Sequence, residues 1–236
     1  MEPRIAIVDA SVGDTEAERN LTREIAAETV VYKASEGDRP PLPTLREQAI
    51  DGVVISGSQT SVYDDHDWIH ELTAWVRTLK RAAVPMLGIC WGHQFLAQAF
   101  GGRVVDMGEY EIGYREIEHR GSSRLFEGID TPMTAFETHS DRVAELPSGA
   151  IELARNEYGI QAFRLGASYG VQFHPEYDRK TVEWILESKQ FDDDTHRAAA
   201  ATITDESVNA ARDTAALFDT FCDIVAGHTR QPSQPW

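Results

Sequence analysis

The sequence has few cysteines, no long apolar run and no recognisable export signal. Cys90 and Cys222 are the only cysteines in 236 residues, which excludes a disulfide-rich scaffold and favours free thiols, although one disulfide stays open. No apolar stretch approaches the ~20 residues that a membrane-spanning helix needs. The N-terminus has no basic segment followed by a long apolar one, so we expect no secretory signal and a cytoplasmic location.

Positive charge is also scarce. The chain carries 22 lysines and arginines against 39 acidic residues, and its formal net charge is −17. The negative electrostatic potential of such a chain repels phosphate backbones and anionic membranes, so neither nucleic acid nor a membrane is expected as a partner. Only four of the basic residues are lysines. Many acids with few lysines fit a protein that works in concentrated salt, and they equally fit a merely acidic protein.

Short apolar runs alternate with helical patterns through the first half of the chain. Strands are predicted at residues 5–8, 30–32, 53–55 and 85–89, and helices at residues 15–29, 45–50, 66–83 and 92–100. This order predicts an α/β fold with a central, mostly parallel sheet flanked by helices. Residues 103–171 predict a mixed or antiparallel extension of the same sheet, and residues 179–189 another helix.

The chain changes character after residue 189. Apolar residues recur at steps of three and four from Val208 to Val225, which predicts a helix with one apolar face. We therefore divide the chain into a domain at residues 1–189 and a helical C-terminal extension at residues 190–236. The apolar face could pack on its own domain, or it could bind a partner.

The strongest chemical signal is the sequence Gly-Ile-Cys-Trp-Gly-His-Gln at residues 88–94, where a buried strand meets a helix. A cysteine on such a turn is lifted out of the sheet, and the flanking glycines let the backbone turn sharply. The helix N-terminus favours negative charge and so increases the thiolate fraction of Cys90. We therefore expect Cys90 to be a nucleophile rather than a small buried side chain.

A second signal is the sequence His174-Pro175-Glu176. Residues i and i+2 of an extended segment point to the same side, and Pro175 keeps His174 out of the helical region. Glu176 can then orient the imidazole of His174, which can exchange a proton with the thiol and with a leaving amine. Alone this tripeptide is a weak signal, but beside a cysteine on a turn it predicts a Cys-His-Glu triad.

Together these motifs resemble those of the class I glutamine amidotransferases, in particular the glutaminase domain of GMP synthetase and its stand-alone relatives. The resemblance covers residues 1–189 and implies a flavodoxin-like sheet and release of ammonia from glutamine. It also implies that the backbone amides of Gly57 and Trp91 form the oxyanion hole. By the same resemblance, Gln94, His139, Ser140 and Asp141 would bind the substrate.

The sequence departs from GMP synthetase in two respects. Residues 56–58 are Ser-Gly-Ser where that group has Gly-Gly-Pro, and no phosphate-cradling loop occurs in the sequence. An ATP-dependent synthetase is therefore a possible partner rather than part of this chain. The same chemistry would also suit a stand-alone hydrolase of γ-glutamyl peptides or conjugates. A non-catalytic regulatory subunit is the third alternative.

No cofactor is expected for amide hydrolysis by a cysteine. One pattern, His66 and His70 one helical turn apart beside several aspartates, has the spacing of metal ligands. An acidic helix N-terminus accounts for the same residues through the helix dipole. We therefore expect no functional metal.

Overall fold

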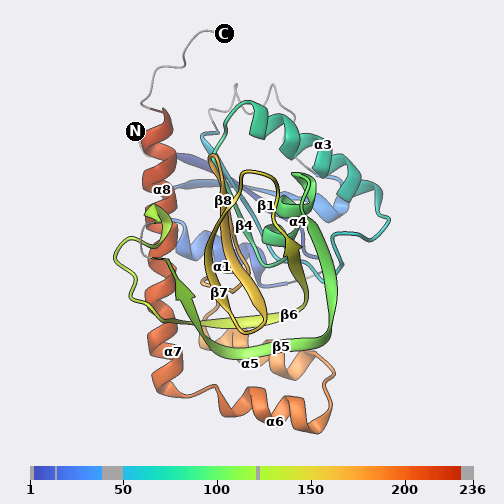
Figure 1. The fold of residues 1–236 in the computed structure, drawn as a ribbon, viewed down its shortest axis with the longest axis vertical. Coiled ribbons are helices and arrows are strands. Elements are labelled where there is room, and N and C mark those ends of the chain that lie inside the picture. The colour runs from blue at the N-terminus through green and yellow to red at the C-terminus, as the bar shows by residue number, and fades with distance from the viewer. Residues whose placement is uncertain (1–2, 14, 39–49, 121–122, 230–236) are drawn as a thin grey trace.

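The computed structural model describes residues 3–13, 15–38, 50–120 and 123–229 (Figure 1). The strands are β1 (Arg4–Asp9), β2 (Glu28–Lys33), β3 (Gly52–Ile55), β4 (Met86–Ile89), β5 (Arg103–His119), β6 (Met133–Glu145), β7 (Ile151–Asn156), β8 (Gly159–Leu165) and β9 (Ser168–Val171). The helices are α1 (Ala17–Glu24), α3 (Asp67–Arg81), α4 (Trp91–Ala99), α5 (Arg179–Ser188), α6 (Asp193–Ala201), α7 (Asp205–Ala211) and α8 (Ala216–Thr229). None of these helices is long and apolar enough to cross a membrane. The helix predicted at residues 45–50 lies almost wholly outside the described residues.

One nine-stranded sheet organises the molecule, in the order β2-β1-β3-β4-β9-β8-β7-β5-β6. The strands from β2 to β9 in this order pair in parallel. The remaining pairs are antiparallel, and β5 and β6 form the long curved ribbon at one end (Figure 1). The predicted α/β fold with a partly parallel, mixed sheet is thus confirmed.

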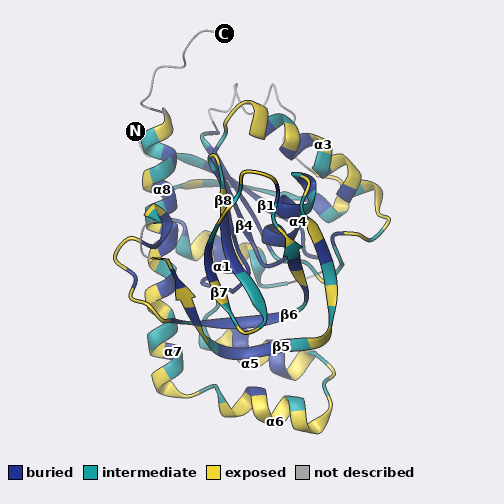
Figure 2. Ribbon diagram, in the orientation of Figure 1, coloured by how far each residue is buried: buried dark blue, intermediate teal, exposed yellow. Residues whose placement is uncertain are grey.

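Helices cover both faces of the parallel half, and alternate residues of each strand point to opposite faces. On β1, Ile5 and Ile7 join a core cluster that contains residues of α1 and α8. Their neighbours Ala6 and Val8 join a second cluster with residues of α3 and α4. Figure 2 shows the central strands as the most buried part of the chain, as expected for a sheet covered on both sides.

The C-terminal segment contains more elements than the single helix that the sequence predicted. Thr204 and Ser207 form a capping box at the start of α7, and a 3-10 turn at Arg212–Ala215 separates α7 from α8. The apolar spacing runs unbroken through this turn, so periodicity could not reveal it. Phe218 and Phe221 of α8 are 1% exposed and pack into the core of the sheet. The apolar face of α8 is therefore covered by its own chain.

The helix predicted at residues 15–29 is shorter than expected. It ends at Glu24, and residues 28–33 form β2 beside β1. The β-branched residues Thr29, Val30 and Val31 favour a strand, and pairing with β1 provides their hydrogen bonds.

Candidate active site

The predicted site residues gather at the carboxyl edge of the parallel strands. Gly57 follows β3, Cys90 follows β4 and His174 lies just beyond β9, and these three strands are neighbours. In open α/β sheets this edge is where ligands bind, because loops from adjacent strands converge there. The sheet order thus brings together residues that are more than 100 positions apart in the sequence.

Cys90 lies on a strained turn between β4 and α4. Its backbone has φ 51° and ψ −105°, a left-handed φ that is uncommon for a residue with a side chain. Its amide donates to the carbonyl of Val171 at 2.8 Å, which ties the turn to β9. A Cβ on Gly88 would lie 2.3 Å from the carbonyl oxygen of Gly92, so the turn requires glycine there. The geometry is that of a nucleophile elbow.

His174 and Glu176 lie side by side, as their spacing predicted. The Nδ1 atom of His174 is 2.8 Å from Oε1 of Glu176, and both side chains are buried. The ring of Tyr177 stacks on the imidazole with centroids 4.0 Å apart and an interplanar angle of 12°. Nδ1 is taken by Glu176, so Nε2 is the nitrogen available to Cys90. Carboxylate and tyrosine together fix the orientation of the imidazole ring.

The charges of Cys90 and His174 stabilise each other. Burial alone would raise the pKa of Cys90, but the charge and hydrogen bond of His174 outweigh it and lower the pKa of the thiol. Burial would lower the pKa of His174, but Glu176 and Cys90 raise it to about 10. Both shifts favour a thiolate beside an imidazolium at neutral pH, which is the reactive form of a cysteine nucleophile.

The two residues expected to form an oxyanion hole lie against this pair. A Cβ on Gly57 would be 3.3 Å from Cε1 of His174 and 3.8 Å from Cβ of Cys90. Trp91 is the first residue of α4, where a backbone N–H has no acceptor within the helix. Its side chain is fixed by stacking on Phe95, with ring centroids 4.7 Å apart. Both amides therefore belong to backbone that lies beside the thiol.

Three of the residues expected to bind substrate form one hydrogen-bonded group with Gln172. Gln94 donates through Nε2 to the carbonyl of Asp141 at 2.8 Å and to Oε1 of Gln172 at 3.0 Å. The Nδ1 atom of His139 is 2.9 Å from the same carbonyl. Gln94 and His139 therefore both hold the backbone carbonyl of Asp141 in place.

Two residues of the same segment, Ser140 and Asp141, line a cavity. The Asp141 carboxylate accepts from the hydroxyl of Tyr63 at 2.9 Å, and Ser140 is half-buried. Both residues line a cavity beside Cys90. Asp141 and Ser140 thus border the cavity that Cys90 also lines.

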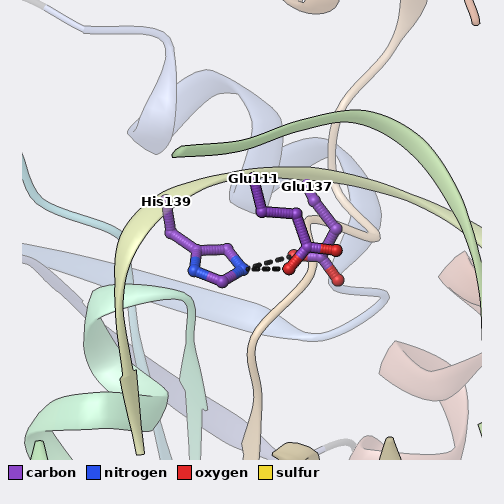
Figure 3. Close-up of side chains that lie close together, drawn as sticks. All are labelled: Glu111, Glu137 and His139. Carbon is purple, nitrogen blue, oxygen red and sulfur yellow. Dashed lines mark ion pairs between the residues drawn. The ribbon is translucent and has the colours of Figure 1, made fainter. Parts of the chain in front are cut away.

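Sequence reasoning missed a charged cluster that surrounds His139 in the interior. The Nε2 atom of His139 lies 2.8 Å from Oε2 of Glu111 and 3.2 Å from Oε2 of Glu137, and both glutamates are fully buried (Figure 3). Asn156 and Gln161 donate to the Glu111 carboxylate. The cluster depends on the cross-strand pairing of Glu111 with His139, which a sequence alone does not reveal.

This cluster holds one cation between two acids. Burial opposes a charged His139, but hydrogen bonds to Glu111 and Glu137 raise its pKa well above the ordinary value. Burial and the charge of Glu111 raise the pKa of Glu137, which favours the protonated form of this carboxyl. One imidazolium thus neutralises one carboxylate, and a proton can neutralise the other.

The same three side chains form the one group in the described part of the chain whose donor atoms are close enough to hold a metal ion. All three side chains are buried. His66 and His70 do not belong to this group, and His70 instead contacts Asp65 at 2.9 Å.

Two openings meet at Cys90. A narrow one of about 60 Å³ lies on the side of His174 and Tyr177. A wide one of about 770 Å³ lies on the side of Gln94 and Asp141. Lys189 lines both, at the end of α5, and was not singled out by any motif.

Comparison with known proteins identifies the family. The model of the family "Glutamine amidotransferase class-I" matches residues 7–189, so this chain belongs to the class I glutamine amidotransferase family. A curated relative, the GMP synthase [glutamine-hydrolyzing] of Azoarcus sp. (strain BH72), is 33% identical over 186 residues that cover 73% of this chain. The chain spans about a third of the length of that relative, of which 34% is covered.

Solved structures share the fold over nearly the whole chain. A glutamine amidotransferase from Thermotoga maritima aligns with a TM-score of 0.73, 20% identity and coverage of 98% of this chain and 100% of that chain. A glutamine amido transferase from Methylobacillus flagellatus gives a TM-score of 0.72, 24% identity and coverage of 96% and 93%. At these identities the likeness establishes the fold alone.

Proposed function

We propose that this chain hydrolyses the side-chain amide of glutamine through a cysteinyl thioester and gives glutamate and ammonia. The observation that carries the proposal is the pairing of a strained, thiolate-favouring Cys90 with a His174 that Glu176 orients at 2.8 Å. Membership of the class I glutamine amidotransferase family supports glutamine as the substrate.

The reaction follows from the roles of these residues. The Cys90 thiolate attacks the amide carbon, and the His174 imidazolium gives its proton to the nitrogen as the C–N bond breaks. Ammonia leaves, and a glutamyl thioester remains. Neutral His174 then takes a proton from water, whose oxygen attacks the thioester and releases glutamate and the thiolate. Glu176 keeps the imidazole in place throughout.

The remaining residues stabilise the transition state and hold the substrate. The amides of Gly57 and Trp91 would donate to the oxyanion of each tetrahedral intermediate, and losing one such donor costs roughly 10²–10³-fold in rate. Asp141, in the wide opening, would hold the amino-acid end of glutamine. Gln94 and His139 would act through the Asp141 carbonyl that both contact.

The fate of the ammonia belongs to the proposal as well. Adding ammonia to a carbonyl-type acceptor needs activation of that acceptor, and the sequence contains no phosphate-cradling loop. The curated relative is a GMP synthase about three times as long as the matched region. We therefore propose that an ATP-dependent synthetase activates the ammonia acceptor.

A second candidate function is hydrolysis of γ-glutamyl peptides or conjugates. The wide opening beside Cys90, about 770 Å³, has room for more than a glutamine side chain. The same thioester chemistry would release a larger amine in place of ammonia.

The test is turnover by the purified chain. We expect glutamate and ammonia from glutamine, no turnover by Cys90→Ala, and no aminated nucleotide when ATP and a nucleotide acceptor are added. An inactive chain that a copurifying synthetase does not activate would refute the proposal. Faster turnover of γ-glutamyl dipeptides than of glutamine would favour the second function.

A further inference from the structure

Within the described part of this strongly acidic chain, Lys189 is a cation without a carboxylate partner. Its Nζ donates to Oγ1 of Thr138 at 2.9 Å and to the hydroxyl of Tyr110. The ion pairs of the described residues include none between Lys189 and an acid. By contrast, Lys33 pairs with Asp9 at 2.9 Å. A half-buried lysine that the fold leaves unneutralised is available to an anionic ligand.

The position of Lys189 places this charge next to the nucleophile. It lines both openings at Cys90, and no other lysine or arginine lines either opening among the described residues. The acids Glu109, Asp141 and Asp192 line the wide opening. That opening therefore offers one positive group and several negative groups, which complements an amino-acid zwitterion.

Counting donors shows what the cation and its two hydroxyl partners can bind. Lysine has three N–H donors, and two are used on Tyr110 and Thr138. The two hydroxyls are 3.1 Å apart, so one donates to the other and a single O–H remains. One N–H and one O–H are left over. A carboxylate has two oxygens that can accept these two bonds.

We propose that Lys189, Tyr110 and Thr138 form the subsite for the α-carboxylate of the substrate. The α-ammonium group of the substrate then lies toward Asp141. This inference rests on the proposed amide hydrolysis and deepens it: the substrate is an amide of an amino acid whose α-carboxylate is free, whether glutamine or a γ-glutamyl conjugate.

The experiment pairs a change in the protein with a change in the substrate. Lys189→Met removes the charge and keeps most of the stem, and glutamine α-amide replaces the carboxylate by a neutral group. For glutamine we expect kcat/KM to fall on the order of 10- to 100-fold in Lys189→Met, mainly through KM. For glutamine α-amide we expect a low kcat/KM already in the wild-type protein, and Lys189→Met should have the same kcat/KM as wild type. Lys189→Arg should restore part of the glutamine activity.

Controls separate this role from folding and from the proposed hydrolysis. Lys80→Met removes a lysine that lies over the ring of Phe100, away from the site, and should leave both substrates unaffected. Equal losses on both substrates, or no loss on glutamine, would overturn the inference while the hydrolysis stands.

Binding gives a readout that does not need turnover. In Cys90→Ala, calorimetry should show tighter binding of glutamine than of its α-amide, and Lys189→Met in that background should abolish the difference. Equal binding of the two ligands by Cys90→Ala, or no binding of either, would overturn the subsite even if wild type proved inactive.

Discussion

Gly92 lies where α4 touches β3, and replacing it by alanine tests how the elbow is built. A Cβ on Gly92 would be 2.4 Å from the carbonyl oxygen of Ile55 and 3.1 Å from its carbonyl carbon. Both atoms are backbone, so no side chain can move aside to relieve the contact. Real Cβ atoms keep at least 3.0 Å, and α4 must therefore move by at least about 0.6 Å.

The size of the effect follows from this displacement. Overpacking of this kind costs about 1–3 kcal/mol, and for a chain of this length each kcal/mol lowers Tm by roughly 2–4 °C. We expect Gly92→Ala to fold with a Tm about 2–12 °C lower. Ile55 lies two residues before Gly57, so the shift also changes the distance between the Cys90 thiol and the loop that contains Gly57. Turnover should fall on the order of 10- to 100-fold.

Thermal unfolding and glutamine turnover measure the two effects separately. Gly227→Ala is the matched control, because a Cβ there would meet nothing closer than 3.9 Å within the described residues and the position is inside α8. Helix propensity predicts a gain of roughly 0.5–1 kcal/mol for this control. A Gly92→Ala variant with wild-type Tm and turnover would show that close packing of the elbow is not required.

Three further predictions concern the thiols, the triad and the charge. Cys90→Ala should abolish turnover and labelling by a glutamine-analogue electrophile, whereas Cys222→Ala should keep activity and lose only some stability, since Cys222 of α8 is in the core. His174→Ala should be nearly inactive, whereas Glu176→Gln should lower kcat by a smaller factor. The lowered pKa of Cys90 predicts alkylation at a lower pH than for a free cysteine, and Glu176→Gln should move that profile to higher pH, because a less basic His174 supports the thiolate less. An unchanged profile would argue against the ion pair. With a net charge of −17, Tm should rise with added salt until screening saturates, and a flat or falling Tm would exclude adaptation to high salt.

The sequence predicted the parallel half of the sheet because its strands are short apolar runs separated by helical patterns. Ile5 to Val8 shows the rule: both faces of the strand are covered, so every residue is apolar. The elbow was predictable because glycines two residues before and after a cysteine, at the end of a buried strand, are typical of a sharp turn into a helix. Close spacing also predicted the contact between His174 and Glu176, which depends only on local extended geometry.

Residues that act across long sequence distances were not predictable. Glu111 meets His139 only through the register of β5 and β6, and that register shifts between Asp106 and Glu111. Lys189 reaches the site because α5 ends beside β6, which no local pattern encodes. Tyr177 stacks on His174 after a turn whose shape the sequence does not specify.

The buried Glu111–His139–Glu137 cluster also determines how the two longest strands can pair. Hydrophobic pairs in a ribbon tolerate sliding, because another apolar side chain replaces the first. A slip of two residues would carry His139 about 6–7 Å from Glu111 and leave charges inside the protein without partners. Breaking a buried pair in this way costs about 3–5 kcal/mol, so a single alignment is strongly preferred. Replacing Glu111, Glu137 and His139 together should then be tolerated better than replacing one of them. The buried charges thus specify a single register of β5 against β6.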